Sequence, residues 1–90
     1  MQEVNADVQR RVLGLVEAIL RQNAIKAEID LDSPLVDVGL TSMDMVNLML
    51  AVEAAFDFTI PQPDITPENF QSVRTLQLMV MRQLHPASAT

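Results

Sequence analysis

Apolar residues recur at helical spacing in three stretches of this chain, and that pattern constrains its fold more than any other feature. The first stretch predicts an amphipathic helix over about residues 6–22, capped by Asn5 or Asp7. The second predicts a helix over Ser42–Phe56, and the third a helix over about 73–84. The residues expected to face the core are Val8, Val12, Leu15, Val16, Ile19, Leu20, Met45, Leu48, Met49, Val52, Phe56, Val73, Leu76, Val80 and Leu84.

The segment over residues 23–41 has turn formers and no sustained period, which predicts a long loop after the first helix. A loop of this length in a compact domain usually signals function. Ser33-Pro34 is expected to start a single helical turn, and Gly39 to supply the backbone freedom for the turn into the next helix. The apolar residues expected to anchor the loop to the core are Ile25, Ile29, Leu31, Leu35 and Leu40.

The connection between the last two long helices is rich in proline. Two prolines predict that Asp57–Pro63 is not helical. Thr66–Phe70 has a cap, a first-turn proline and an acid, so we expect a one-turn helix there, followed by Ser72 as the cap of the last helix.

These elements predict an all-α fold, a small antiparallel four-helix bundle of three main helices and one short helix, with a long loop after the first helix. We expect residues 1–90 to form a single domain, with a core over about 6–84 and a flexible tail over 85–90.

Composition and charge exclude several functions. The chain has no cysteine, so it has neither a disulfide nor a thiolate metal site. A net charge of −6 disfavours nucleic acid, while the polar N-terminus and the lack of a long apolar run predict no membrane segment and a cytoplasmic location. Asp30–Leu35 begins like a calcium loop, but Leu35 stands where the loop needs glycine, so we expect no metal.

Ser42 is the strongest candidate for a functional residue in this chain. Thr41 fits the cap position of the second helix, and Asp44 completes a capping box. Ser42 then lies in the first turn, where an exposed hydroxyl beside free N–H groups suits a phosphate ester. The bland alternative is an ordinary first-turn serine. A hydrolase is a remote alternative, because the only histidine, His85, stands in the tail; we therefore expect Ser42 to be modified by another enzyme.

The outer face of the second helix is unusually apolar. Met43, Asn47, Leu50 and Ala54 share this face, with Val46 at its edge. Two interpretations remain open from the pattern alone: packing against neighbouring helices, or docking of a partner protein.

A longer pattern connects these features: Leu35-x-x-x-Gly39-Leu40-x-Ser42-Met43-Asp44, then Val46-x-Leu48-x-x-x-Val52-Glu53-x-x-Phe56, then Ile60-Pro61. This succession resembles the acyl carrier protein family, and the resemblance extends from the first helix to about Leu84. It implies that a phosphopantetheinyl transferase attaches 4′-phosphopantetheine, taken from coenzyme A, to Ser42. The arm would then carry acyl or aminoacyl groups as thioesters, and the chain itself would not be an enzyme. By the same resemblance, the residues expected to contact partners are Met43, Asp44, Val46, Asn47, Leu50 and Glu53.

The chain also departs from the family pattern. It reads Thr41-Ser42-Met43 where members of fatty-acid synthesis usually read Asp-Ser-Leu, and Asn47 and Ala54 occupy places that are often acidic. A less charged docking face predicts a specialised carrier, loaded by a dedicated ligase with an unusual acyl chain or an amino acid. A monomer is the default expectation. The alternative is a cofactor-free interaction module that docks through the second helix. Two interpretations stay open for Met45, Met49 and Met79: they line an apolar cavity for the cargo between the second and last helices, or they simply fill the core.

Overall fold

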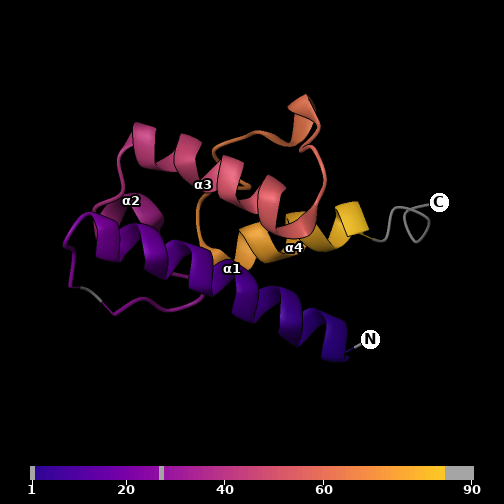
Figure 1. The fold of residues 1–90 in the computed structure, drawn as a ribbon, viewed down its shortest axis with the longest axis horizontal. Coiled ribbons are helices and arrows are strands. Elements are labelled where there is room, and N and C mark those ends of the chain that lie inside the picture. The colour runs from indigo at the N-terminus through magenta and orange to yellow at the C-terminus, as the bar shows by residue number, and fades with distance from the viewer. Residues whose placement is uncertain (1, 27, 85–90) are drawn as a thin grey trace.

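The computed structural model describes residues 2–26 and 28–84, with side chains from residue 6 onward. These residues form four α-helices and one 3-10 turn, and none of them is in a strand, which confirms the predicted all-α class. The elements are α1 (Gln2–Gln22), α2 (Leu35–Val38), α3 (Ser42–Phe56), η1 (Gln62–Asp64) and α4 (Val73–Leu84). In Figure 1, α1 and α3 run in opposite directions, so the start of α3 lies at the same end of the bundle as the end of α1.

Helix α1 begins earlier than the sequence pattern indicates. It starts at Gln2 and not near residue 6, so the prediction that Asn5 or Asp7 caps it is wrong, and both lie inside the helix. The sequence does carry a signal for this extra turn, because Val4 continues the four-residue spacing of Val8 and Val12, and Gln and Glu are good helix formers. The helix ends in a Schellman motif: the Ile25 N–H donates to the Leu20 carbonyl over 2.9 Å, and Ala24 adopts φ 58°.

The predicted long loop contains the short helix α2. Pro34 is the residue before this helix, and the Leu35 N–H donates to the Gln71 carbonyl over 2.8 Å, which ties α2 to the segment before α4. Gly39 ends α2 with φ 112°, as expected, and a Cβ there would lie 3.2 Å from Cδ1 of Ile25. All five predicted anchors contribute to the core: two are buried and three pack against it, namely Leu35, Leu40, Ile25, Ile29 and Leu31.

The connection between α3 and α4 differs from its prediction in two places. Residues Gln62–Asp64 form η1, although Asp57–Pro63 was expected to contain no helix; a single 3-10 turn accepts proline in its first turn, where no N–H is needed. Thr66–Phe70 forms a hydrogen-bonded turn and not a helix, with the Phe70 N–H donating to the Thr66 carbonyl over 3.2 Å. The Ser72 hydroxyl accepts from the Thr75 N–H over 3.2 Å, as a cap of α4.

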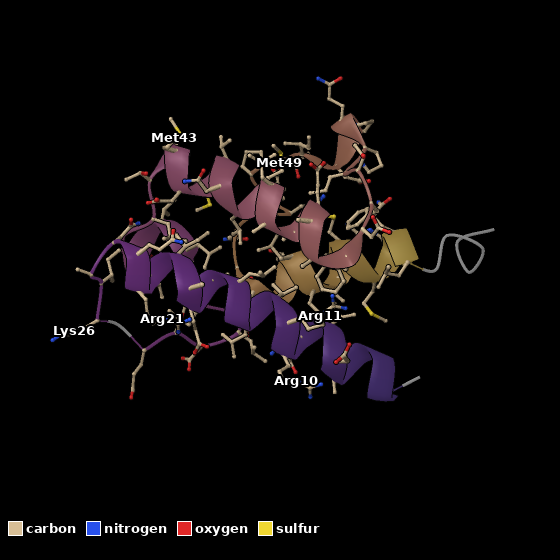
Figure 2. All side chains as sticks on the ribbon, viewed as in Figure 1. Arg10, Arg11, Arg21, Lys26, Met43 and Met49 are labelled. Carbon is tan, nitrogen blue, oxygen red and sulfur yellow. The ribbon has the colours of Figure 1, made fainter. Side chains whose placement is uncertain are left out.

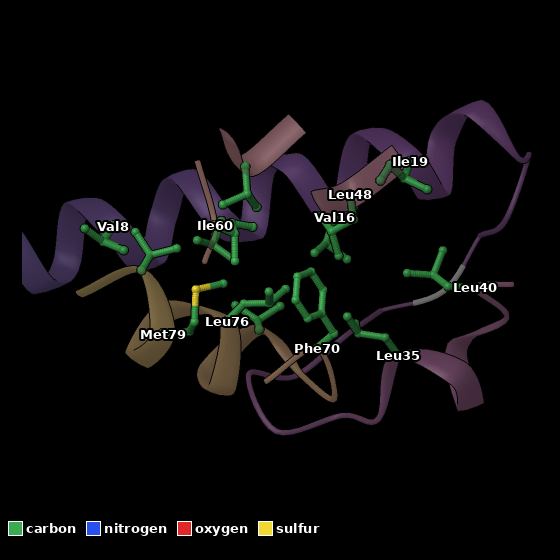
Figure 3. Packing of buried hydrophobic residues seen from close by; sticks show 14 of the residues in the cluster. Val8, Val16, Ile19, Leu35, Leu40, Leu48, Ile60, Phe70, Leu76 and Met79 are labelled. Atoms are coloured by element: carbon green, nitrogen blue, oxygen red, sulfur yellow. The ribbon is translucent and has the colours of Figure 1, made fainter. Parts of the chain in front are cut away.

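One cluster of buried side chains holds the helices together, and Figure 3 shows α1, α3, α4 and the loops contributing to it. On α3, Leu48, Val52 and Phe56 are buried, and Met45 and Met49 pack against them, as predicted. Leu84 is 37% exposed, so the prediction that it faces inward is wrong; burial on α4 stops one turn earlier, at Val80. The core therefore fixes α3 by one face only and leaves its opposite face uncovered.

Candidate functional site

A reciprocal capping box fixes the start of α3. The Thr41 hydroxyl accepts from the Asp44 N–H over 3.2 Å, and the Asp44 carboxylate accepts from the Thr41 N–H over 2.8 Å and from the Thr41 hydroxyl over 3.0 Å. This confirms the motif that the sequence predicts. Because both residues are bound to each other, the backbone on either side of Ser42 is held in one conformation.

Asp44 is buried despite its charge, with 9% of its surface exposed. Hydrogen bonding from the Thr41 backbone, and next from the Asn23 side chain, holds the pKa of the Asp44 carboxyl below its usual range. Asn23, just after the end of α1, thus acts on the charge of a residue in the first turn of α3. Asn23 is a residue that sequence reasoning missed, because its contact depends on how the loop folds back.

The Ser42 side chain is exposed, and its hydroxyl has no hydrogen-bond partner among the described residues. The first helical hydrogen bond of α3 runs from the Met45 N–H to the Thr41 carbonyl over 3.0 Å. The N–H groups of Ser42 and Met43 precede that bond, so they stay free at the positive end of the helix. The site can therefore present a hydroxyl for esterification and accommodate the negative charge of a phosphodiester beside it.

A groove with a volume of about 670 Å³ opens beside Ser42. Its walls are α3 and the segment before α4, with one residue from α2; the lining residues are Val36, Ser42, Met45, Val46, Met49, Ile65, Thr66, Pro67, Glu68, Phe70 and Gln71. The predicted lining by Met45 and Met49 is confirmed. The prediction for Met79 is wrong, because that residue is fully buried on α4 and the groove lies against the preceding segment. Sequence reasoning did not identify this wall, because it placed the cavity against the last helix and expected Thr66–Phe70 to be a separate short helix.

The uncovered face of α3 is apolar and exposed. Met43 is 68%, Val46 46% and Leu50 53% exposed, and Asn47 and Ala54 are exposed with them. We call these five residues the outer face of α3. The two acids on this helix bind within the chain: Asp44 belongs to the capping box, and the Glu53 carboxylate accepts from the Ile60 N–H over 2.8 Å. In Figure 2, Met43 and Met49 lie on α3, while Arg10, Arg21 and Lys26 lie along α1 and the loop after it.

The other end of α3 is covered by Arg11 of α1. The Arg11 guanidinium lies 4.2 Å from the centre of the Phe56 ring and donates to the Ala55 carbonyl, in the last turn of α3. A cation at this end of a helix stabilises its negative pole. Helix α3 is thus anchored at both ends by side-chain bonds.

Three sequence expectations remain: the role of His85 and the tail, the lack of a metal site, and the lack of a membrane segment. His85, which the hydrolase alternative requires, and the tail over 85–90 lie outside the described residues. Within 2–26 and 28–84, no group of three or more His, Cys, Asp or Glu side chains could hold a metal ion. No helix over the same residues combines the length and apolar character needed to cross a membrane.

Comparison with known proteins places these features in a family. The family model described as a phosphopantetheine attachment site matches residues 10–80. Aminoacyl carrier protein 1 of Bradyrhizobium diazoefficiens is 66% identical over 89 residues, covering 99% of each chain. Aminoacyl carrier protein 2 of the same organism is 51% identical over 88 residues, covering 98% of this chain and 99% of its own length.

Solved structures agree with these relatives. One chain comes from the crystal structure of the Bradyrhizobium japonicum glycine:[carrier protein] ligase complexed with its cognate carrier protein and an analogue of glycyl adenylate. It matches with 67% identity and a TM-score of 0.74, over 84% of this chain and 99% of that chain. The holo acyl carrier protein of Nitrosomonas europaea matches with 28% identity and a TM-score of 0.59, over 93% of this chain and 98% of that chain. The fold, the exposed serine at the start of α3 and these matches together identify the chain as a member of the acyl carrier protein family, whose prosthetic group is phosphopantetheine.

Proposed function

We propose that this chain bears 4′-phosphopantetheine on Ser42 and carries aminoacyl groups as thioesters between partner enzymes. The observation that carries the proposal is the exposed Ser42 hydroxyl, which has no partner among the described residues and lies within the matched region of the family model. When bound, the group supplies the thiol that a chain without cysteine lacks. The aminoacyl cargo is proposed because two relatives that cover almost the whole chain are aminoacyl carrier proteins.

The residues around Ser42 fit this role by positioning it. Thr41 and Asp44 hold the turn, so the hydroxyl meets a transferase in a fixed orientation. The free N–H groups of Ser42 and Met43 stabilise the phosphodiester charge after transfer. The carboxylate of this turn, Asp44, already accepts two hydrogen bonds from Thr41, and no hydrogen bond joins it to the Ser42 hydroxyl, so the transferase must remove the hydroxyl proton. The chain therefore acts as a substrate and not as an enzyme.

The proposed partners are a phosphopantetheinyl transferase, a dedicated aminoacyl ligase and the enzymes that receive the aminoacyl group. The ligase is proposed because a 67% identical chain occurs in a structure of a glycine:[carrier protein] ligase with glycylated carrier protein. For docking, the exposure of Met43, Val46, Asn47 and Leu50 supports their predicted role. The roles predicted for Asp44 and Glu53 have less support, since both carboxylates accept hydrogen bonds within the chain. The cytoplasmic location and the monomeric state of the protein stay predictions.

Mass spectrometry tests the attachment site directly. Incubation with coenzyme A and a broad-specificity transferase should add one phosphopantetheine mass to the wild-type chain and none to Ser42→Ala. Ser33→Ala is the matched control, because it removes another hydroxyl outside α3 and should still be modified. Modification of Ser42→Ala, or an unmodified wild type after treatment with several transferases, would contradict the proposal.

The cofactor-free interaction module is the less favoured alternative, because the family match is to a phosphopantetheine attachment site. It predicts a partner that binds the wild-type chain and Ser42→Ala equally well, with no added mass on either. A pull-down with both proteins, each checked by mass spectrometry, separates the two functions.

A further inference from the structure

The groove beside Ser42 has two chemically different walls. The α3 wall consists of Met45, Val46 and Met49, which are apolar, and the two methionines are flexible enough to adapt to an occupant. The opposite wall contributes polar groups from Thr66, Glu68 and Gln71 as well as apolar ones. An occupant of this groove can therefore place apolar carbons against α3 and a polar end beside the exposed side chains of Glu68 and Gln71.

Attachment at Ser42 would place an occupant at this groove. Ser42 itself lines the groove, so any arm attached to its hydroxyl starts at the groove wall. A short flexible tether raises the effective concentration to about the millimolar range, so even contacts with millimolar affinity would be occupied for much of the time. The volume of about 670 Å³ also falls within the range of small-molecule sites, about 300–1,000 Å³.

Charge complementarity indicates the class of cargo. Glu68 is exposed, and it is the one carboxylate among the described residues that line the groove. An aminoacyl thioester ends in a cationic α-ammonium group, whereas a fatty acyl chain ends in an uncharged methyl group. A carboxylate at the groove wall therefore attracts an aminoacyl cargo and offers a fatty acyl chain nothing.

We propose, on the basis of the proposed function, that the groove seats the aminoacylated arm, with Met45 and Met49 contacting its apolar carbons and Glu68 pairing with the ammonium group of the cargo. The chain thereby distinguishes a charged cargo from a neutral one before any partner binds. An exposed ion pair is weak on its own, but the tether lets a weak pair shift the balance between seated and free arms.

The test uses nuclear magnetic resonance of the isotopically labelled chain after transfer of two coenzyme A analogues. One analogue carries glycine and the other carries glycolate, its neutral isostere, and both are joined by an amide that resists hydrolysis. Mass spectrometry first establishes that each arm is attached. We expect the glycyl arm to shift backbone resonances of residues 65–71 more than the glycolyl arm does, and both arms to shift those of Met45 and Met49.

Two substitutions identify the charge responsible. Glu68→Gln should reduce the difference between the two arms at residues 65–71 at least twofold. Asp37→Asn, which removes an exposed carboxylate of α2 that does not line the groove, should preserve the difference. Because charge carries the effect, raising NaCl to about 1 M, where the Debye length is ~3 Å, should reduce the difference in the wild type as well.

The outcomes separate this inference from the proposed function. Equal shifts from the two attached arms, or no shift at the groove residues, would overturn the inference while leaving Ser42 as the attachment site. Preservation of the difference in Glu68→Gln would also overturn it. A chain that stays unmodified in the first step would overturn the proposed function, and this inference with it.

Discussion

Replacement of Thr41 by alanine should destabilise the bundle through one defined contact. The substitution removes the hydroxyl that accepts from the Asp44 N–H over 3.2 Å and donates to the Asp44 carboxylate over 3.0 Å. It leaves the second half of the capping box in place, because the Thr41 N–H still donates to that carboxylate. The Asp44 N–H is then left without its side-chain acceptor at the start of α3.

The expected magnitude follows from measured helix caps. Removal of a Thr cap by alanine costs about 0.5–2 kcal/mol of the free energy of unfolding, and ~1 kcal/mol is typical. For a domain of this size, ~1 kcal/mol lowers the melting temperature by about 4–8 °C. We expect an effect of this order, because Thr41 is exposed and contributes little buried apolar area that would add to the loss.

Urea unfolding followed by circular dichroism measures the change, with Thr41→Ser as the matched control. Serine keeps the hydroxyl, so it should retain most of the stability, while alanine should not. Transfer of phosphopantetheine to Ser42 should persist in both variants at temperatures where they are folded. Equal unfolding free energies for the alanine and serine variants would refute the reasoning that the hydroxyl caps α3.

Three further predictions concern other parts of the chain. Ala24→Gly should raise the free energy of unfolding by about 1 kcal/mol, measured by urea titration, because Ala24 holds φ 58° at a position that favours glycine. Asp44→Asn should be less stable than the wild type at pH 7, and the gap should narrow below pH 3.8: a lowered carboxyl pKa stabilises the fold above that value, and the stabilisation disappears as the pH falls through the lowered pKa. Equal gaps at pH 3 and pH 7 in urea titrations would contradict this. Val46→Asp should slow aminoacyl loading about tenfold in a ligase assay, whereas Leu78→Asp, at a comparably exposed site on α4, should not; equal rates would argue against docking through α3.

Sequence reasoning predicted the parts of the fold that local patterns encode. The bounds of α3 were predicted correctly because Thr41 and Asp44 mark its start and an apolar period runs through it to Phe56. The positive φ of Gly39 follows from its residue type, and the buried face of α3 follows from the spacing of its apolar residues. Ser42 was placed in the first turn for the same reason, although its role as the attachment site stays a proposal.

The errors fall where the outcome depends on contacts between distant segments or on weak local signals. The first turn of α1 holds a single apolar residue, Val4, so the local signal for helix there is weak. The position of the groove depends on how residues 65–71 fold against α3, and the Leu35 N–H bond to the Gln71 carbonyl helps to fix that arrangement. Arg11 illustrates the same limit, since no spacing within α1 indicates that it covers the end of α3.

The anchoring of α3 at its two ends has a consequence for engineering. The capping box and the Arg11 contacts involve none of the five residues on the outer face, so the proposed docking residues are separate from the side chains that anchor the helix ends. Grafting the corresponding five residues of another carrier onto this helix should therefore redirect the protein to a foreign ligase while its melting behaviour stays unchanged. The choice of partner could then be changed without redesigning the bundle.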